Sequence, residues 1–195
     1  MSIDEILKEV GEDKTDNLCT TSFEFKRNIW NLFQDYQDKV AVEFGTHKGQ
    51  TTRILSFLFK KVYTVNINSN EASKHLNRDR SNIVHIDNFD LYSDSILPIQ
   101  EPVDMFLVDA GHEYDHVTSD ISRIVSMKRS SKCYVIFDDF GLEQYSHTVK
   151  QAIQHAVDSK ILEYVGGIGH STGFNFGGTP PRILTDHEGV VTRVL

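Results

Sequence analysis

The segment Val108–His116, with the sequence VDAGHEYDH, holds the residues best suited to chemistry. It contains the string H-E-x-x-H, which in zinc proteases places two histidines on one face of a helix, with the glutamate as general base. Here an apolar run and Gly111 come directly before His112, so this histidine would stand at the start of a helix. The string therefore indicates either a zinc hydrolase or a histidine at the strand-to-helix turn of a different active site.

Three carboxylates are predicted to meet near this histidine. One apolar run reads as a strand that ends at Asp109, and another ends at Asp138 and Asp139. If the two strands are neighbours in a parallel sheet, their carboxylates lie close together and repel one another unless a cation lies among them. Ligation by oxygen alone favours Mg²⁺ or another hard divalent cation. His112 could act as a general base at the same place.

A glycine turn follows an earlier predicted strand. In EFGTHKGQTT, residues 43–52, Gly45 and Gly49 separate a β-branched run from a helical pattern. Such a turn lets a ligand approach the backbone at a helix N-terminus. The spacing matches neither the dinucleotide fingerprint nor the P-loop. A turn that serves packing alone is the alternative interpretation.

Strands and helices alternate along the chain. Helices are expected at residues 3–10, 22–37, 51–59, 70–78, 113–127 and 143–159, and strands at 39–44, 61–67, 82–86, 103–109 and 133–137. Further β-like runs follow at 161–165, 182–184 and 190–195. This order predicts a doubly wound α/β fold, with a mainly parallel sheet, helices on both faces and an antiparallel C-terminal edge. We expect an N-terminal extension, residues 1–20, and a single domain, residues 21–195.

The composition narrows the classes of partner. The chain has 195 residues and a formal net charge of −8, which argues against a nucleic-acid partner. The acidic N-terminus has no apolar core of a secretory signal, and no apolar run is long enough to span a membrane. Cys19 and Cys133 show no metal or disulfide spacing, so we expect a cytoplasmic protein. Subunits of a homo-oligomer could complete each other's sites.

The stretch EFGTHKGQTT resembles the first motif of class I S-adenosylmethionine-dependent methyltransferases. The resemblance implies a Rossmann-like fold with a seven-stranded sheet and S-adenosylmethionine as the cofactor. It assigns cofactor contacts to Glu43, Gly45, Thr46, Gly49, Asn66, Asp87 and Asp109. Asn66 departs from the family, which usually places at this strand end an acid that binds the ribose hydroxyls. An amide offers one oxygen and no charge, so we expect weaker cofactor binding.

The stretches FLVDAGHEYDHV and IFDD resemble one branch of this family, the metal-dependent sugar O-methyltransferases related to macrocin O-methyltransferase and the cephalosporin hydroxylase group. The resemblance covers about residues 20–160. It implies that Asp109, Asp138 and Asp139 ligate the metal and that His112 is the catalytic base. The acceptor would be a hydroxyl of a small molecule, such as a sugar or polyol. Because of Asn66, a cofactor-binding scaffold protein or a diverged enzyme with altered cofactor use is the alternative.

Overall fold

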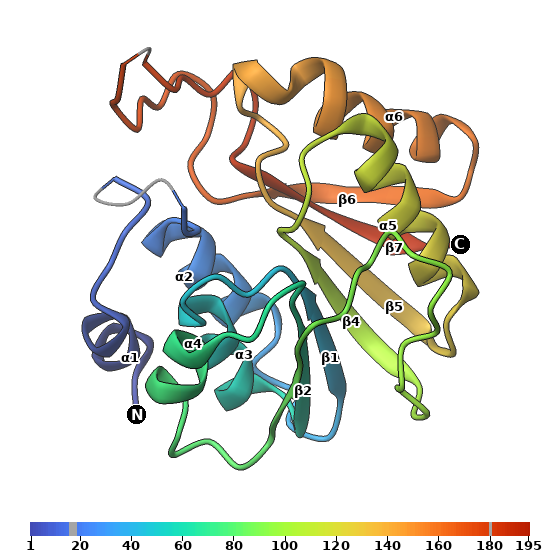
Figure 1. Ribbon diagram of the computed structural model, residues 1–195. Helices are drawn as coiled ribbons and strands as arrows, with labels where there is room; N and C mark the ends of the chain where they lie inside the picture. Colours follow the sequence, from blue (N-terminus) through green and yellow to red (C-terminus); the bar gives the residue numbers. More distant parts are fainter. Residues whose placement is uncertain (16–18, 180) are drawn as a thin grey trace.

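The protein is built around one seven-stranded sheet (Figure 1). The computed structural model describes residues 1–15, 19–179 and 181–195. The strand order is β3-β2-β1-β4-β5-β7-β6, in which β1 to β5 pair in parallel and β7 runs antiparallel between β5 and β6. The strands are β1 (Val40–Phe44), β2 (Lys61–Val65), β3 (Ile83–Ile86), β4 (Val103–Val108), β5 (Arg129–Phe137), β6 (Leu162–Ile168) and β7 (Gly189–Val194). The predicted fold class is confirmed.

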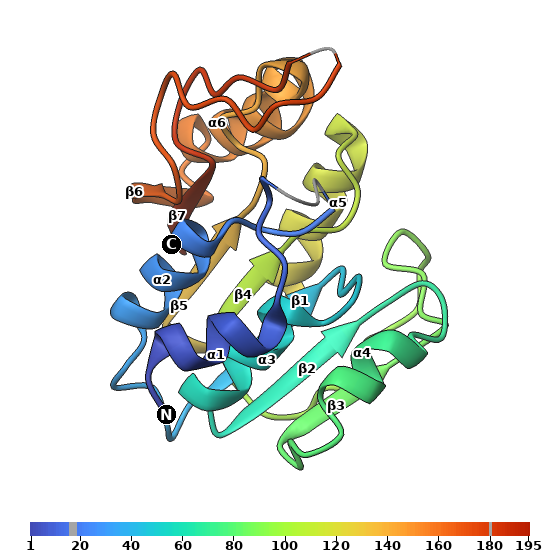
Figure 2. The same ribbon diagram turned by 90° about the vertical axis from the view of Figure 1, so that its left-hand side faces the viewer.

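Helices cover both faces of the sheet, and Figure 2 shows α1, α2 and α3 in front of it. They are α1 (Ile3–Val10), α2 (Phe23–Leu32), α3 (Gln50–Leu58), α4 (Glu71–Leu76), α5 (Tyr114–Ser126) and α6 (Gln151–Asp158). Among the described residues, none of these helices combines the length and apolar character needed to cross a bilayer.

Side chains alternate between the two faces of each strand, which divides the core into two layers. Val42 and Phe44 of β1 pack in the layer that contains α5 and α6, whereas Ala41 packs in the layer that contains α1, α2 and α3. Strand β1 lies between β2 and β4, so the connections leave it in opposite directions along the sheet. This switch point is the place where open α/β sheets bind ligands.

Several predicted elements differ from the structure in extent or kind. Strand β5 begins at Arg129 and not at the predicted residue 133, and β6 continues to Ile168 beyond the predicted residue 165. Helix α2 ends at Leu32, before the predicted residue 37, because the chain enters turns in which the Tyr36 amide donates to Phe33. The helix predicted at 143–159 is divided into a 3₁₀ turn (Glu143–Tyr145), a π turn (Ser146–Lys150) and α6. Residues 182–184 form only isolated bridges with residues 175 and 142, not a strand.

The predicted N-terminal extension contributes to the main core. Ile6, Leu7 and Val10 of α1 are buried in the layer that α2 and α3 share. Gly11 ends α1 with a left-handed backbone (φ 73°), a conformation that glycine adopts without strain. Positions 16–18 of the extension lie outside the described residues. The segment after Gly11 is therefore close enough to the sheet to reach the ends of its strands.

Candidate functional site

The turn after β1 lies directly against the end of β4. Gly45 has φ 86°, and a Cβ atom there would lie 1.9 Å from the carbonyl oxygen of Asp109. The Gly45 amide donates to Val65 and the Asp109 amide donates to Phe44, so backbone bonds hold both turns in place. Only glycine permits so close an approach of these two chain segments. The contact joins the two turns that the sequence marks as candidate sites.

A pocket of about 330 Å³ opens beside this contact, which is within the size range of small-molecule sites. Its lining comes from the end of β2, the segments that follow β1 to β4 and the first turn of α5: Gly45, Thr46, His47, Val65, Asn66, Ile67, Phe89, Asp90, Leu91, Tyr92, Asp109, Ala110, Gly111 and His116. Four predicted cofactor contacts are among them, namely Gly45, Thr46, Asn66 and Asp109. The other three, Glu43, Gly49 and Asp87, do not line it.

Glu43 lies beneath the turn and not in the pocket. Its position in β1 directs it to the face of the sheet covered by α3, where it accepts hydrogen bonds from the hydroxyls of Thr52 and Thr64. It is 2% exposed, and burial raises the pKa of its carboxyl group to about 7. Its contacts secure α3 against β1 and β2 and so fix the turn that holds the pocket open.

Gly49 has a packing role in the structure. Its φ is 80°, and a Cβ atom there would lie 2.3 Å from the Ser73 hydroxyl and 2.7 Å from the Asn77 amide nitrogen of the neighbouring α4 region. The Asn77 amide also donates to the Gly49 carbonyl at 3.1 Å. The glycine therefore allows α3 to begin close to α4.

After β3, the acid that lines the pocket is Asp90 and not Asp87, to which the resemblance assigns a cofactor contact. Asp87 forms an ion pair with Lys74 at 2.6 Å outside the pocket, whereas Asp90 lines the pocket and accepts from the Tyr92 amide. Tyr92 accepts a hydrogen bond from the Gly111 amide at 2.9 Å and stacks on His116, with ring centroids 4.0 Å apart. Asp90 and Tyr92 carry no signal in the sequence, because they lie in an irregular segment without periodicity.

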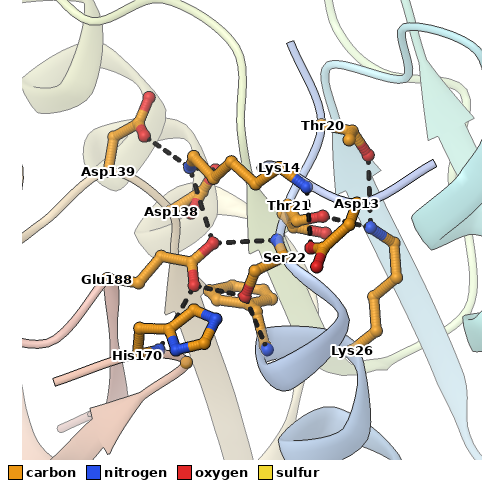
Figure 3. Close-up of polar contacts among 12 residues, drawn as sticks. Asp13, Lys14, Thr20, Thr21, Ser22, Lys26, Asp138, Asp139, His170 and Glu188 are labelled. Carbon is orange, nitrogen blue, oxygen red and sulfur yellow. Dashed lines mark hydrogen bonds and ion pairs between the residues drawn. The ribbon is translucent and has the colours of Figure 1, made fainter. Parts of the chain in front are cut away.

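The three predicted carboxylates at the ends of β4 and β5 do come together. Ligand oxygens of Asp109 and Asp139 lie within 4.8 Å of each other, and Asp138 directly precedes Asp139. The Asp138 amide donates to the Val108 carbonyl, which keeps the two strand ends level. A lysine far away in the sequence contacts two of them (Figure 3): Lys14 Nζ is 2.9 Å from Asp138 Oδ2 and 2.8 Å from Asp139 Oδ1. We call Lys14, Asp109, Asp138, Asp139 and the nearby Glu188 the acid cluster.

The carboxyl groups of the acid cluster differ in their affinity for protons. Burial, together with Asp138 and Asp139, raises the pKa of Asp109 well above its usual value. Burial also raises the pKa of Asp138 to about 7, although Lys14 opposes this effect. Burial would raise the pKa of Asp139 too, but Lys14 and His112 outweigh it and hold that pKa below its usual range. Of the three aspartates, Asp139 therefore loses its charge least readily.

His112 lies beside the charged carboxylate. Its Nε2 is 2.9 Å from Asp139 Oδ2, although the ring is not aligned for a straight hydrogen bond, and its ring stacks on Tyr145 at 4.6 Å. Contact with Asp139 raises the pKa of His112, while burial opposes the effect. The imidazole is thus oriented by an acid and an aromatic ring, as in a general base held by a carboxylate.

The two histidines of H-E-x-x-H face different regions. Helix α5 begins at Tyr114, after His112, and His116 turns toward the pocket, where it stacks on Tyr92. In the part of the chain that the structure describes, the group of three suitable metal donors is Asp109, His112 and Asp139, with ligand atoms within 4.8 Å of one another. His116 is not in that group, so the arrangement of a zinc protease helix is absent from the described residues.

A known protein family matches the central part of the chain. Residues 42–140 match a family described as "Methyltransferase domain". No curated protein matches the sequence of this chain.

Solved structures with a similar fold cover nearly the whole chain. Cofactor-bound Rv0187 from MTB has a TM-score of 0.67 at 13% identity, covering 98% of this chain and 95% of its own. The O-methyltransferase TomG from Streptomyces achromogenes, involved in tomaymycin synthesis and solved with SAM, has a TM-score of 0.65 at 14% identity. The match covers 98% of this chain and 90% of TomG. A putative O-methyltransferase from Klebsiella pneumoniae has a TM-score of 0.63 at 14% identity, and the match covers 98% of this chain and 89% of that protein. At these identities the likeness shows the fold.

Proposed function

The chain belongs to the methyltransferase domain family, and on this premise we propose that it transfers a methyl group from S-adenosylmethionine to a hydroxyl of a small molecule. The expected enzyme class, an S-adenosylmethionine-dependent methyltransferase, is confirmed by the family match. The narrower resemblance to the macrocin O-methyltransferase branch stays a prediction. One observation carries the proposal: Asp109 lines the pocket and also belongs to the acid cluster beside His112.

The pocket suits a nucleoside with a charged side chain. Val65, Ile67, Phe89 and Leu91 provide apolar walls of the kind that purine rings contact. Asn66 stands at the end of β2, where its side-chain oxygen can accept a hydrogen bond, and its amide nitrogen donates to the Asn68 carbonyl. When bound, S-adenosylmethionine supplies an electrophilic methyl group on a sulfonium. These features support the cofactor assignment.

His112 is the residue we assign to proton removal. We assign the ring proton to Nε2, the nitrogen 2.9 Å from Asp139 Oδ2, and this assignment leaves the lone pair on Nδ1. Nδ1 would accept the proton of the acceptor hydroxyl, and Asp139 would stabilise the imidazolium that forms. General-base catalysis of this kind contributes a factor of about 10²–10⁴.

The predicted set of three carboxylates does not fit a divalent metal in this structure. The Lys14 ammonium lies between Asp138 and Asp139, where the ion would have to be. The other group of donors, Asp109, His112 and Asp139, would commit the imidazole to the metal and remove the base. We therefore assign the proton transfer to His112 without a Mg²⁺ step.

The acceptor is proposed to be a sugar-like or polyol-like molecule. This assignment rests on the sequence resemblance and on the place of the proposed base, His112, beside Asp109, which lines the pocket. The protein's negative charge of −8 also disfavours a nucleic-acid acceptor. From the sequence we also propose that the protein forms a homo-oligomer and is located in the cytoplasm.

Calorimetric titration with S-adenosylmethionine and S-adenosylhomocysteine tests the cofactor directly. We expect micromolar binding of both, followed by methyl transfer from radiolabelled cofactor to a member of a panel that contains glucose, rhamnose and myo-inositol. Absence of binding would contradict the proposal and favour a diverged protein that has lost the cofactor. Binding without transfer to any hydroxyl compound would favour a cofactor-binding scaffold.

A further inference from the structure

The segment between α1 and α2 carries a lysine into the acid cluster. Lys14 is 1% exposed, and its ammonium contacts Asp138 and Asp139, which lie 124 and 125 positions later in the sequence. Figure 3 shows its side chain extended toward these carboxylates. Nothing in its local sequence marks this lysine, so its role is visible only in the fold.

The residues before Lys14 attach the segment to the body of the protein. Glu12 pairs with Lys48 at 2.8 Å, at the turn that precedes α3. Asp13 accepts a hydrogen bond from the Phe23 amide at 2.8 Å, at the start of α2. Two consecutive anchors on different elements fix the direction in which Lys14 projects. The position of the Lys14 side chain in the acid cluster is therefore fixed by the fold of this segment.

The remaining sides of the ammonium are also enclosed. Glu188 Oε1 lies 3.5 Å away, and this fully buried acid is held by the Ser22 amide at 2.9 Å and the His170 amide at 3.3 Å. The ring of Phe176 lies 5.5 Å from Lys14 Nζ. Three carboxylates and one aromatic ring surround the charge, which is the environment of a small-cation site.

The ammonium overlaps with the position that a metal held by both Asp138 and Asp139 would need. Divalent ions sit about 2.0–2.6 Å from carboxylate oxygens, and Lys14 Nζ already lies 2.8–2.9 Å from the two aspartates. Burial alone would lower the pKa of Lys14, but Asp138, Asp139 and Glu188 together raise it well above its usual value. The lysine therefore stays charged, and a second cation at this place would meet strong repulsion.

We propose that Lys14 is the resident cation of the acid cluster and takes the place of a divalent metal, so that methyl transfer by this protein needs no metal. Lys14 is a positioning residue: it holds Oδ1 of Asp139 and leaves Oδ2 facing His112. The statement about methyl transfer rests on the proposed function, whereas the exclusion of metal by Lys14 does not.

Calorimetric titration of Mn²⁺ into the full chain, without cofactor, tests the exclusion of metal. We compare wild type with Lys14→Met, which removes the charge but keeps most of the side-chain volume. Lys150→Met is the matched control, because Lys150 pairs with Asp186 at 2.8 Å outside the cluster. We expect no saturable Mn²⁺ binding in wild type or Lys150→Met, and saturable binding in Lys14→Met. Wild-type turnover should be unchanged by EDTA.

Two results would overturn the proposal: saturable Mn²⁺ binding to wild type with turnover that EDTA abolishes, or a folded Lys14→Met protein that binds no Mn²⁺. Thermal unfolding of each variant shows whether it is folded. If Lys14→Met does not fold, the wild-type titration still decides. Titration of S-adenosylmethionine into the same samples separates the two claims, because failure there contradicts the proposed function and leaves the Mn²⁺ result valid.

Discussion

The pocket and the acid cluster lie on either side of Asp109, yet they are built in different ways. The pocket is formed by short turns that directly follow β1 to β4, and its shape depends on backbone contacts such as that between Gly45 and Asp109. The acid cluster is formed by charges, and the cation that pairs with its carboxylates is Lys14, from the N-terminal segment. Local turns can thus make a binding site, whereas balanced buried charge requires a long-range partner.

The largest expected effect separates the two regions by function. His112→Ala should lower kcat by about 10²–10⁴-fold, because it removes the proposed base. Affinity for S-adenosylmethionine should stay at the wild-type value, since His112 does not line the pocket. Steady-state kinetics and calorimetry measure the two quantities. His147→Ala, at an exposed position, is the control. A kcat close to the wild-type value would show that His112, and with it the neighbouring acid cluster, has no role in catalysis.

The second prediction concerns the contact that joins the two regions. Gly45→Ala should abolish cofactor binding, because the new Cβ would clash with the Asp109 carbonyl in addition to adopting a strained backbone. Gly173 has a similar φ of 87° but no atom within 4 Å of the position a Cβ would take, so Gly173→Ala isolates the backbone strain, worth about 1–3 kcal/mol. Calorimetry and thermal unfolding compare the variants. Equal cofactor affinity in both would show that the close approach does not matter.

The third prediction uses the pH dependence of turnover. Asp139 raises the pKa of His112 above 6.5, and the base acts only when it is deprotonated, so activity should rise with pH through a midpoint above that value. Asp139→Asn removes the raising contact and should move the midpoint to lower pH. The pH profile of kcat, measured for both proteins, tests the direction. An unchanged midpoint would mean that another group limits the rate.

The smallest expected effect is a change in cofactor affinity caused by a substitution in the pocket. Asn66→Asp restores the second carboxylate oxygen and the charge that the family usually has at this strand end. Charge-assisted hydrogen bonds are about twice as strong as neutral ones, so cofactor affinity should rise about tenfold. Calorimetry with S-adenosylmethionine measures the change, and Asn68→Asp on the neighbouring loop is the control. Weaker binding by Asn66→Asp would place the ribose elsewhere.

The local patterns of the sequence predicted the fold and part of the site. Alternating strands and helices indicated the doubly wound sheet, and the strand ends indicated that Asp109, Asp138 and Asp139 would converge. The contribution of Lys14 could not be predicted, because it depends on where α1 packs and on how Gly11 turns the chain. The same patterns could not distinguish Glu43, which faces α3, from residues that face the pocket, since every residue of β1 is buried.

A crystal structure of the protein with S-adenosylhomocysteine tests the central claim most directly, that the pocket and the acid cluster form one site that meets at Asp109. We expect the nucleoside between the turns that contain Gly45 and Asn66, with the sulfur atom directed toward Asp109 and the side of His112. Density for the nucleoside in another cavity, or a sulfur atom directed away from Asp109, would contradict the account.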